Sequence, residues 1–486
     1  HVNFNKMAFE TTASGATSVL LDGADTINFD ECKFNSGTSF GAYSLYFDGG
    51  ATSIDVTNST ISGGYYAVYS SNSGVEDIYF DKNEFVDVEY MAIYANYIEN
   101  IEITNNTFKD FGRNTNYAFY SNYSDDIDFH YNDVESYYSI YVRYGENSRW
   151  TNNVINGDYY GIRFFRHNTS SDTVWVVNNM ISAGNAYAYY HYYNDKTLVY
   201  HNSFHVTGSG YGMYALYGDD NQFFNNSVVI NSSGYYGFYC FYGFDEMDYN
   251  NWYFNGSNTY WAYVDGNFTN NWGQFQGAGG HNDSSRYGDP SYFSNTDLHT
   301  GAVQLNNWAD TSITNAYSVT SVDIDGDSRP YSPDPRADVG ADEYYVADYD
   351  VDIAQIDGPI SGNLGNNTVT ATFMNAGKNA ITNDTIFVQY SAVTQGNSAN
   401  YTVTDTIVFS NFAVAADTTF EFSTAWNIQN SGDYTLCVRI SGQISGDPDA
   451  SDEECIDLCT GNNGTFSLDP SGNGDFETFA EAVDFL

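Results

Sequence analysis

The sequence predicts an all-β protein: a parallel β-helix of about eleven coils, then an immunoglobulin-like β-sandwich, then the start of a further β-helix cap. A motif recurs every 21–26 residues through the first half of the chain. Aromatic residues make up 18% of the chain and there are only 7 Pro, a composition that suits pleated, half-buried sheets. After residue 348, short alternating runs separated by turn residues predict antiparallel strands.

The recurring motif is an Asn followed by hydrophobic residues, as in "NNTF", "NNVI" and "NNMI". Equivalent positions in stacked coils lie about 4.8 Å apart, so an inward Asn can bond the next Asn in the column. Ser59 and Cys32 hold this position upstream, and Asn271 holds it downstream. The predicted ladder consists of Asn83, Asn106, Asn132, Asn153, Asn179, Asn202, Asn226 and Asn251.

A second register aligns "YAFYSNY", "YSIYVRY", "YGIRFFR", "YAYYHYY", "YGMYALY" and "YGFYCFY". The two-residue period predicts strands with one buried face. The predicted outward aromatic surface consists of Tyr120, Tyr141, Tyr190, Tyr214, Tyr239 and Tyr263. Such a row is unusual on a solvated face. It could pack against protein, stack on sugar rings, or stack on itself from coil to coil.

The balance of charged residues limits the classes of molecule that the protein can bind. The chain has 15 Lys and Arg against 62 Asp and Glu, a formal net charge of −47. This field repels nucleic acid and anionic lipid, so we expect neither as a partner. No apolar run approaches the ~20 residues that cross a bilayer, so we expect no membrane insertion. The expected partners are other copies or neighbouring units of the same polypeptide, with polysaccharide as an alternative.

The Asn ladder at this period resembles the right-handed parallel β-helix of the pectate-lyase-like superfamily, over residues 1–290. That superfamily includes lyases, hydrolases, tailspikes and adhesins, so the resemblance implies a fold and not an activity. In residues 291–347, "DIDGDSRPYSPDPRADVGADEYY" resembles the segment that ends the β-helix in secreted proteins of the Bacteroidota. This resemblance implies that the helix ends here and that the protein is exported.

Two further segments follow. Residues 348–459 are expected to form the sandwich, and "TVTATFMNAGKNA" resembles a CARDB-type adhesion module. Residues 460–486 contain "GTFSLDPSGNGDFETFAEAVDFL", which resembles the N-terminal strand and helix that cap a pectate-lyase-like β-helix. We therefore expect the chain to be one part of a longer polypeptide with tandem units. The alternative is a C-terminal helix that merely docks on the rest of the protein.

Catalytic candidates are few. Polygalacturonase-like members of the superfamily carry "NTD", paired Asp, "GHG" and "RIK" on neighbouring coils. Here "NTD" lies outside the coils, and "GHG" and "RIK" do not occur. The weak candidates are the basic residues Arg143, Arg163, Arg166 and His191. Arg163 could abstract a proton from a uronate while Arg143 neutralises its carboxylate. Alternatively, the arginines lie on the tyrosines by cation–π contact. From these observations we expect no enzymatic activity.

Three smaller patterns complete the predicted sites. Asp323, Asp325 and Asp327 in "DIDGDS" are spaced as in Ca²⁺-binding loops, or else form a hydrogen-bonded turn. We expect no other cofactor. Cys437, Cys455 and Cys459 cluster, so one pair could bridge, and Cys437–Cys455 is the candidate disulfide. "DT" followed by an apolar residue or Thr matches the O-glycosylation pattern of exported Bacteroidota proteins at Thr26, Thr173, Thr385, Thr406 and Thr418.

Three functions remain open, all extracellular, at the cell surface or secreted. The first is a structural or adhesive repeat protein, one unit of a long surface fibre. The second is a polysaccharide lyase or hydrolase. The third is a glycan-binding module.

Overall fold

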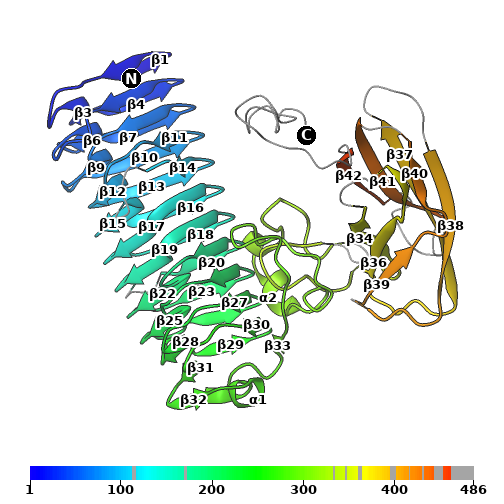
Figure 1. Cartoon of the computed structure of the whole chain (residues 1–486). Helices are drawn as coiled ribbons and strands as arrows, with labels where there is room; N and C mark the ends of the chain where they lie inside the picture. The colour runs from blue at the N-terminus through cyan, green and yellow to red at the C-terminus, as the bar shows by residue number, and fades with distance from the viewer. Residues whose placement is uncertain are drawn as a thin grey trace, which may run out of the picture. The chain divides into compact units, whose positions relative to one another are not determined.

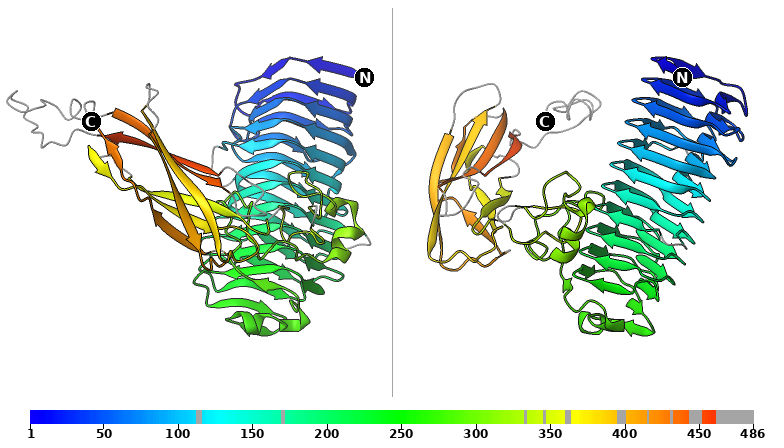
Figure 2. Two further views of the ribbon diagram at one scale, coloured as in Figure 1. Left: turned by 90° about the vertical axis from the view of Figure 1, so that its right-hand side faces the viewer. Right: turned by 180° about the vertical axis from the view of Figure 1, so that it is seen from behind.

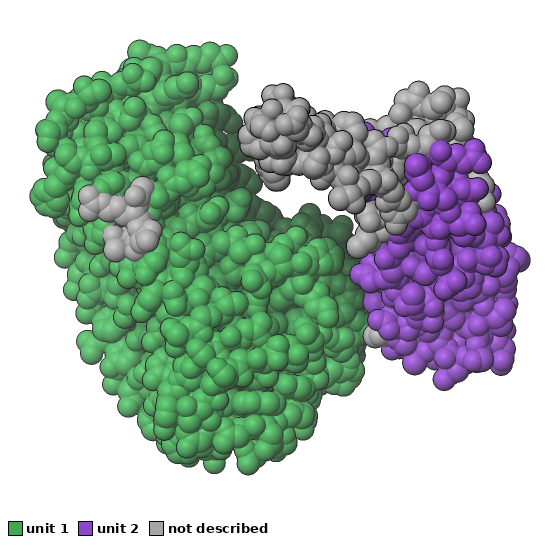
Figure 3. Space-filling model, viewed as in Figure 1, with its two compact units in different colours: residues 1–345 green, residues 346–486 purple. Residues whose placement is uncertain are grey.

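The structure is a computed structural model of the 486-residue chain (Figure 1). It describes residues 1–111, 116–168, 172–331, 334–344, 347–359, 364–394, 401–414, 416–429, 432–442 and 452–460. The chain forms two compact units, His1–Tyr345 and Val346–Leu486 (Figure 3). Most of the predicted cap at 460–486 lies outside the described residues.

The first unit is a parallel β-helix whose coils stack one on another (Figures 1 and 2). One face of the helix is an 11-stranded parallel sheet, here called sheet A. Its strands, in order, are β1 (Val2–Asn5), β4 (Asp25–Asp30), β7 (Thr52–Thr57), β10 (Val75–Asp81), β13 (Ile98–Thr104), β16 (Asp125–His130), β18 (Ser148–Thr151), β20 (Val174–Val177), β23 (Thr197–Tyr200), β26 (Gln222–Phe224) and β29 (Glu246–Asp248).

The other strands of the coils form two parallel columns that merge at the long strands β17 (Asp133–Arg143) and β19 (Val154–Phe165). The column next to sheet A contains β2 (Ala8–Glu10), β5 (Lys33–Ser36), β8 (Thr60–Gly63), β11 (Glu84–Val86), β14 (Thr107–Lys109), β21 (Met180–Ala183), β24 (Ser203–Val206), β27 (Ser227–Ile230), β30 (Asn251–Phe254) and β33 (Arg286–Tyr287). The second, here called sheet C, contains β3 (Thr17–Asp22), β6 (Tyr43–Asp48), β9 (Tyr66–Ser70), β12 (Met91–Asn96), β15 (Tyr117–Asn122), β22 (Tyr189–Tyr192), β25 (Met213–Leu216), β28 (Tyr236–Phe241) and β31 (Tyr260–Val264).

The core fills the inside of the coils with stacked apolar side chains. In sheet C, Phe119, Ile140 and Ile162 come from successive coils, pair in register and are fully buried. Aromatic rings continue the stack from sheet A, where Phe129 lies 5.3 Å from Trp150, centroid to centroid. A coil cannot bury this face alone, so the stability of the unit depends on contact between neighbouring coils.

The corner after each strand of sheet A carries the asparagine ladder. Asn179 Oδ1 accepts hydrogen bonds from the backbone N–H and from Nδ2 of Asn153, at 3.0 and 2.9 Å. Asn179 Nδ2 donates to Asn202 Oδ1 at 2.9 Å and to the carbonyl of Trp150 at 2.7 Å. The side-chain bond from one rung to the next starts from Asn83, Asn106, Asn132, Asn153, Asn179, Asn202 and Asn226. The buried amides thereby satisfy backbone groups where the chain turns out of the sheet.

The structure corrects the last predicted rung. The backbone N–H of Asn226 donates to Asn250 Oδ1 at 2.8 Å, whereas Asn251 already belongs to β30. The adjacent asparagines in "YNNWYF" allow either alignment in sequence. The corner itself takes one residue in the left-handed region immediately before the ladder member, and here that residue is Tyr249, with a φ of 54°. The ladder member is therefore Asn250.

Asn271 is also not a rung of the ladder. It is the N-cap of the short helix α1 (Trp272–Phe275), where its side chain accepts from the Gln274 N–H at 3.1 Å. The next rung after Asn250 is Ser285, whose Oγ accepts from the Asn250 N–H at 3.0 Å. Between them the chain leaves the coil as β32 (Asn267–Thr269), which pairs antiparallel with β31, then α1 and η1 (Ala278–Gly280). Phe275 of this insertion is buried and packs on the core of the last coils.

Residues 291–331 and 334–344, called the strap below, turn back along the outside of the ladder corner. They contain α2 (Thr311–Ala316) and η2 (Ser318–Thr320), and α2 is drawn beside sheet A in Figure 1. Asn152 and Asn178 hold the strap, because their Nδ2 atoms donate to the carbonyls of Asp323 and Val322 at 2.6 and 2.7 Å. Both asparagines immediately precede ladder members, so the strap follows the ladder on its outer side.

A buried ion pair locks the strap. Arg329 Nη1 lies 3.2 Å from Glu343 Oε2, and both side chains are fully buried. The same Nη1 lies 3.1 Å from Nδ1 of His201, the corner residue between β23 and the ladder. Burial lowers the pKa of His201 far below its ordinary value, and the Arg329 charge adds to this effect. The neutral imidazole can then accept the guanidinium hydrogen bond.

The second unit consists of antiparallel sheets around its own core. Its sheets are β34 (Val351–Gly358) with β36 (Thr370–Asn375) and β39 (Asp417–Glu421); β35 (Gly365–Asn367) with β40 (Trp426–Ile428); and β38 (Tyr401–Phe409) with β37 (Asp384–Thr394), β41 (Gly432–Gly442) and β42 (Glu453–Thr460). Phe373, Val388 and Leu436 lie fully buried between them. The finer assignment to a CARDB-type immunoglobulin-like module stays a prediction.

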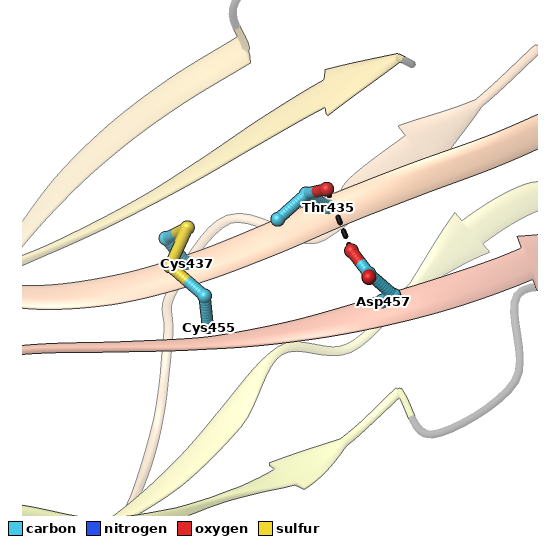
Figure 4. The surroundings of a disulfide bond; sticks show 4 residues. All are labelled: Thr435, Cys437, Cys455 and Asp457. Atoms are coloured by element: carbon cyan, nitrogen blue, oxygen red, sulfur yellow. Dashed lines mark hydrogen bonds between the residues drawn. A yellow bond between two sulfur atoms is a disulfide. The ribbon is translucent and has the colours of Figure 1, made fainter. Parts of the chain in front are cut away.

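Cys437 and Cys455 form a disulfide between β41 and β42, where they pair in register (Figure 4). On the same two strands, Thr435 Oγ1 donates to Asp457 Oδ1 at 2.7 Å. Cys32 and Cys240 in the first unit are free and buried.

We predict that Asn179→Ala lowers the free energy of unfolding by about 2–4 kcal/mol, because it leaves buried carbonyl and N–H groups without partners. Guanidinium unfolding followed by tryptophan fluorescence measures this change. The matched control is Asn35→Ala, at an exposed position of β5. Equal stability of the two variants would contradict a structural role for the ladder.

We predict that the double variant Cys437→Ser/Cys455→Ser destabilises the second unit by about 3 kcal/mol, since the bond closes a loop with a sequence separation of 18. Differential scanning calorimetry of the whole chain follows the unfolding transition of this unit. A reducing agent should reproduce the loss in the native chain and change nothing further in the double variant.

Candidate functional site

The outer face of sheet C is covered by tyrosines that stack from coil to coil. Strand pairing places Tyr120, Tyr141, Arg163, Tyr190, Tyr214, Tyr239 and Tyr263 in one column. Tyr190 and Tyr214 stack at 4.9 Å with 8° between their planes, and Tyr214 and Tyr239 at 5.0 Å with 11°. Burial raises the pKa of Tyr190 and Tyr214, so both remain protonated at neutral pH. We call this surface the tyrosine face.

A parallel column widens the face. Tyr187, Tyr211 and Tyr236 stack in succession, with centroids 6.1 and 5.8 Å apart. Beside this column lies a hollow of about 380 Å³, and its lining includes Tyr159, Tyr187, Tyr211, Tyr235, Gly210 and Gly234. The tyrosine face is thus an aromatic surface with a groove along one side, which is a shape that flat ligands can occupy.

Two of the predicted arginines, Arg143 and Arg163, lie on this face, and Arg166 lies at the corner that follows β19. The Arg163 guanidinium sits between two rings, 4.6 Å from the Tyr141 centroid and 4.8 Å from the Tyr190 centroid. Arg143 lies 5.1 Å from the Tyr144 centroid, and Arg166 lies 5.5 Å from that of Tyr193. These distances are those of cation–π contacts.

The electrostatics of the arginines favour binding and oppose proton abstraction. A hydrogen bond from Arg143 Nη1 to the Tyr120 hydroxyl, 3.2 Å long, raises the Arg143 pKa. Burial pulls the Arg163 pKa down, but the surrounding tyrosines Tyr141 and Tyr190 more than offset this effect, so its pKa is also raised. Guanidiniums held in the charged form can attract an anion but cannot act as a base.

The prediction that His191 belongs to this basic cluster is wrong. It points into the core, is fully buried, and lies 3.2 Å from the Tyr189 hydroxyl through Nδ1. In β22 it alternates with Tyr190 and Tyr192, so the same two-residue period that exposes those tyrosines turns His191 inward. Burial lowers its pKa to about 3, which leaves it neutral. His191 is a core residue.

The three aspartates predicted as Ca²⁺ ligands, Asp323, Asp325 and Asp327, do not form one shared site. Asp323 is fully buried, and its Oδ1 accepts from the backbone N–H groups of Asp325 and Asp327 at 2.9 and 2.7 Å. Its Oδ2 accepts from the N–H of Glu343 at 3.0 Å. Asp323 therefore organises the turn of the strap, which is the alternative that the sequence left open.

Asp325 instead lies with His299 and Asp342, whose ligand-type atoms come within 4.8 Å of one another. His299 Nε2 lies 3.0 Å from Asp325 Oδ2, and its Nδ1 lies 2.5 Å from Asp297 Oδ1. Burial would lower the pKa of His299, but these carboxylates raise it above its ordinary value. A protonated imidazole can thus neutralise the carboxylates itself, and Ca²⁺ binding stays a prediction.

The five threonines predicted for O-glycosylation are all at least partly exposed: Thr26, Thr173, Thr385, Thr406 and Thr418. Thr26 lies in β4, and the last three lie on strands of the second unit.

The outer face of sheet A holds polar residues that sequence reasoning missed. Strand pairing aligns Glu102, Asp128, Arg149 and Trp175 in one column. The strands of sheet C can be recognised in the sequence because they repeat nearly the same Tyr-rich motif. The sheet A column cannot be recognised in this way, because a different residue occupies the position in every coil. Only its two-residue alternation with inward residues such as Phe129 could have revealed it.

The comparisons with known proteins agree with the coiled architecture. Residues 2–136 and 43–169 match the family model described as "Right handed beta helix region", so this part of the chain is a right-handed β-helix. No curated protein matches the sequence. No helix in the described residues is long and apolar enough to cross a membrane.

Three solved structures are similar in fold. A mutant of the periplasmic alginate epimerase AlgG has a TM-score of 0.33 and 12% identity, covering 53% of this chain and 70% of that one. PfbA, a surface adhesin of Streptococcus pneumoniae, has a TM-score of 0.29 and 13% identity, covering 44% and 60%. The enzymatically active domain of tailspike protein 2 of Bacteriophage CBA120 has a TM-score of 0.24 and 6% identity, covering 94% and 68%. At such scores these likenesses assign no function to the chain.

They do correct one expectation from the sequence. The missing motif sets led us to expect no enzymatic activity, and that expectation is wrong, because an epimerase and enzymatically active tailspike domains are among the similar β-helices. Activity has to be measured on the protein itself.

We predict that His191 makes the first unit sensitive to acid. The unfolded chain binds a proton at His191 below about pH 6.5, whereas the folded chain does so only near its pKa of about 3. The contribution to stability is therefore complete above pH 6.5 and falls by about 1.4 kcal/mol per pH unit between these values. Buried carboxylates with raised pKa, such as Asp342, act in the opposite direction, so slopes of variants must be compared.

His191→Phe should remove this part of the pH dependence in urea unfolding measured from pH 7.5 to about pH 4.5. Tyr189→Phe is the matched control, since it removes the hydrogen-bond partner of His191 but leaves the titrating ring. Identical slopes for the native chain and His191→Phe would show that His191 is not held neutral.

Proposed function

We propose that the protein is an exported, extracellular adhesive protein that binds polysaccharide through the tyrosine face. The observation that carries the proposal is the continuous column of stacked, half-exposed tyrosines with Arg163 set into it and Arg143 beside it. Aromatic rings offer an apolar surface with a polar rim, which suits the apolar face of a sugar ring surrounded by hydroxyls.

Spacing supports a polymeric ligand over a small one. Tyr190, Tyr214 and Tyr239 repeat at about one coil spacing, close to 5 Å. A chain of linked rings could therefore meet equivalent tyrosines at several coils in succession. Multiple weak contacts of this kind add up to useful affinity.

Charge supports an anionic polysaccharide. The whole chain has only 15 Lys and Arg, yet Arg143 and Arg163 lie on this face and Arg166 lies at its edge. Their attraction for a carboxylate or sulfate group would offset the repulsion from the net charge of −47. The ligand class that fits both features is an acidic polysaccharide, for which a uronate polymer is a suitable probe.

Assembly of repeated units into a surface fibre stays a prediction from the sequence. The same applies to contacts with other copies of the chain, which would compete with polysaccharide for the tyrosine face.

Affinity electrophoresis in gels containing polygalacturonate, alginate or a neutral glucan tests the proposal. We expect retardation by the acidic polymers, weakened about tenfold in Tyr214→Ala/Tyr239→Ala because two stacking contacts are lost. Arg163→Gln should weaken binding to the acidic polymers and leave any binding to the neutral glucan unchanged. New reducing ends and unsaturated products are assayed in the same incubations.

Tyr79→Ala, on the outer face of sheet A, is the control and should bind like the native protein. Circular dichroism checks that each variant is folded. Retardation that is absent for every polymer, or equal in the tyrosine double variant and the control, would refute a role for the tyrosine face.

A further inference from the structure

A second surface of the β-helix has the form of a ligand site. Two adjoining hollows, of about 400 and 510 Å³, lie on the outer face of sheet A and share Asp128 and Arg149 in their linings. The strands β16, β18 and β20 form the floor, and η2 of the strap forms one wall. The tyrosine face lies on sheet C, so the two surfaces are separate.

Asp128 and Arg149 are two opposite charges that are not used within the protein. They pair in register on neighbouring coils, so their Cα atoms lie about 4.8 Å apart. Among the described residues, neither side chain forms an ion pair or a hydrogen bond. In a chain with 62 acidic residues, a guanidinium that faces a hollow without a carboxylate partner is available to a ligand.

An aromatic corner stands next to these charges. Trp175 follows Arg149 in the column of sheet A. The ring of Tyr317 from the strap meets it edge to face, with centroids 4.8 Å apart and 72° between planes. Asn178 fixes this part of the strap, donating from Nδ2 to the carbonyl of Val319 at 3.1 Å. The corner is therefore a rigid apolar wall at one end of the hollow.

The opposite end is acidic. The smaller hollow is lined by Glu76, Asp77, Glu99 and Asp126 in addition to Asp128. Near the junction, His130 Nε2 lies 3.4 Å from Glu102 Oε1, which adds polar groups to the rim. This field would repel a plain anion at Arg149 and would favour a ligand that brings its own positive charge.

We propose that this site binds a zwitterionic α-amino-acid group. The ammonium contacts Asp128 and faces the acidic end, the carboxylate contacts Arg149 in a two-point hydrogen bond, and an apolar or aromatic side chain rests in the corner of Trp175 and Tyr317. The three groups of the ligand are all attached to one carbon, and Asp128, Arg149 and Trp175 lie on three successive strands of sheet A, so one ligand can meet all three. This site is independent of the proposed binding of polysaccharide.

Isothermal titration calorimetry of the whole chain with L-phenylalanine tests the proposal. N-acetyl-L-phenylalanine lacks the positive charge, L-phenylalaninamide lacks the negative charge, and L-alanine lacks the ring. Each removes one of the three contacts, so we expect each to bind roughly 10-fold or more weakly than L-phenylalanine. No binding of L-phenylalanine at millimolar concentration, or equal binding of the acetylated compound, would overturn the proposal.

Three variants assign the contacts. Asp128→Asn and Arg149→Gln should each weaken L-phenylalanine binding roughly 10- to 100-fold, because a charged hydrogen bond is lost. Trp175→Ala should weaken L-phenylalanine but bring its affinity close to that of L-alanine. All three positions are on the outer face of the sheet, and unfolding midpoints check that the variants remain folded.

Arg163→Gln on the tyrosine face is the matched control, since it removes a guanidinium elsewhere on the same helix. It should leave L-phenylalanine binding unchanged, whereas Arg149→Gln should leave retardation by polysaccharide unchanged. The two proposals can therefore fail separately. An equal loss of amino-acid binding in both arginine variants would point to a nonspecific charge effect and contradict the assigned site.

Discussion

The hydrogen-bonded column of asparagines is the constraint on which the β-helix depends. Each amide both donates and accepts, so one side chain satisfies its neighbour in the stack and the backbone at its own corner. A buried polar group without a partner costs about 1–3 kcal/mol, so a coil that shifts by one residue loses both kinds of bond. The ladder therefore holds every coil in the same register as the next.

Because all coils share one register, residues at the same position of successive coils become neighbours on the surface. Where the outward residue repeats, as on sheet C, the result is a stacked aromatic surface in which Arg163 replaces one ring and rests between Tyr141 and Tyr190. Where it varies, as on sheet A, unlike groups become neighbours about 4.8 Å apart. Asp128, Arg149 and Trp175 meet in this way, although each is separated from the next by 21 or 26 residues.

The strap adds contacts that coil stacking alone does not supply. Its ion pair between Arg329 and Glu343 has no exposure to water, and such a pair is strongly destabilising when one partner is removed. The neutral His201 and the outer asparagines of the ladder corner join the strap to the helix. By placing Tyr317 against Trp175, the strap also completes one wall of the sheet A hollow.

The sequence by itself determined the features that repeat: the all-β coils, the inward apolar residues, most of the asparagine ladder and the outward tyrosines. Repetition is visible because stacked coils impose the same requirement at the same position each time. The tertiary structure decided what occurs once. In the structure the last rung is Asn250, His191 points into the core, and the Asp323 carboxylate accepts hydrogen bonds from backbone N–H groups. The tertiary structure also brought the strap onto sheet A, because contacts between residues more than 100 positions apart leave no local pattern in a chain.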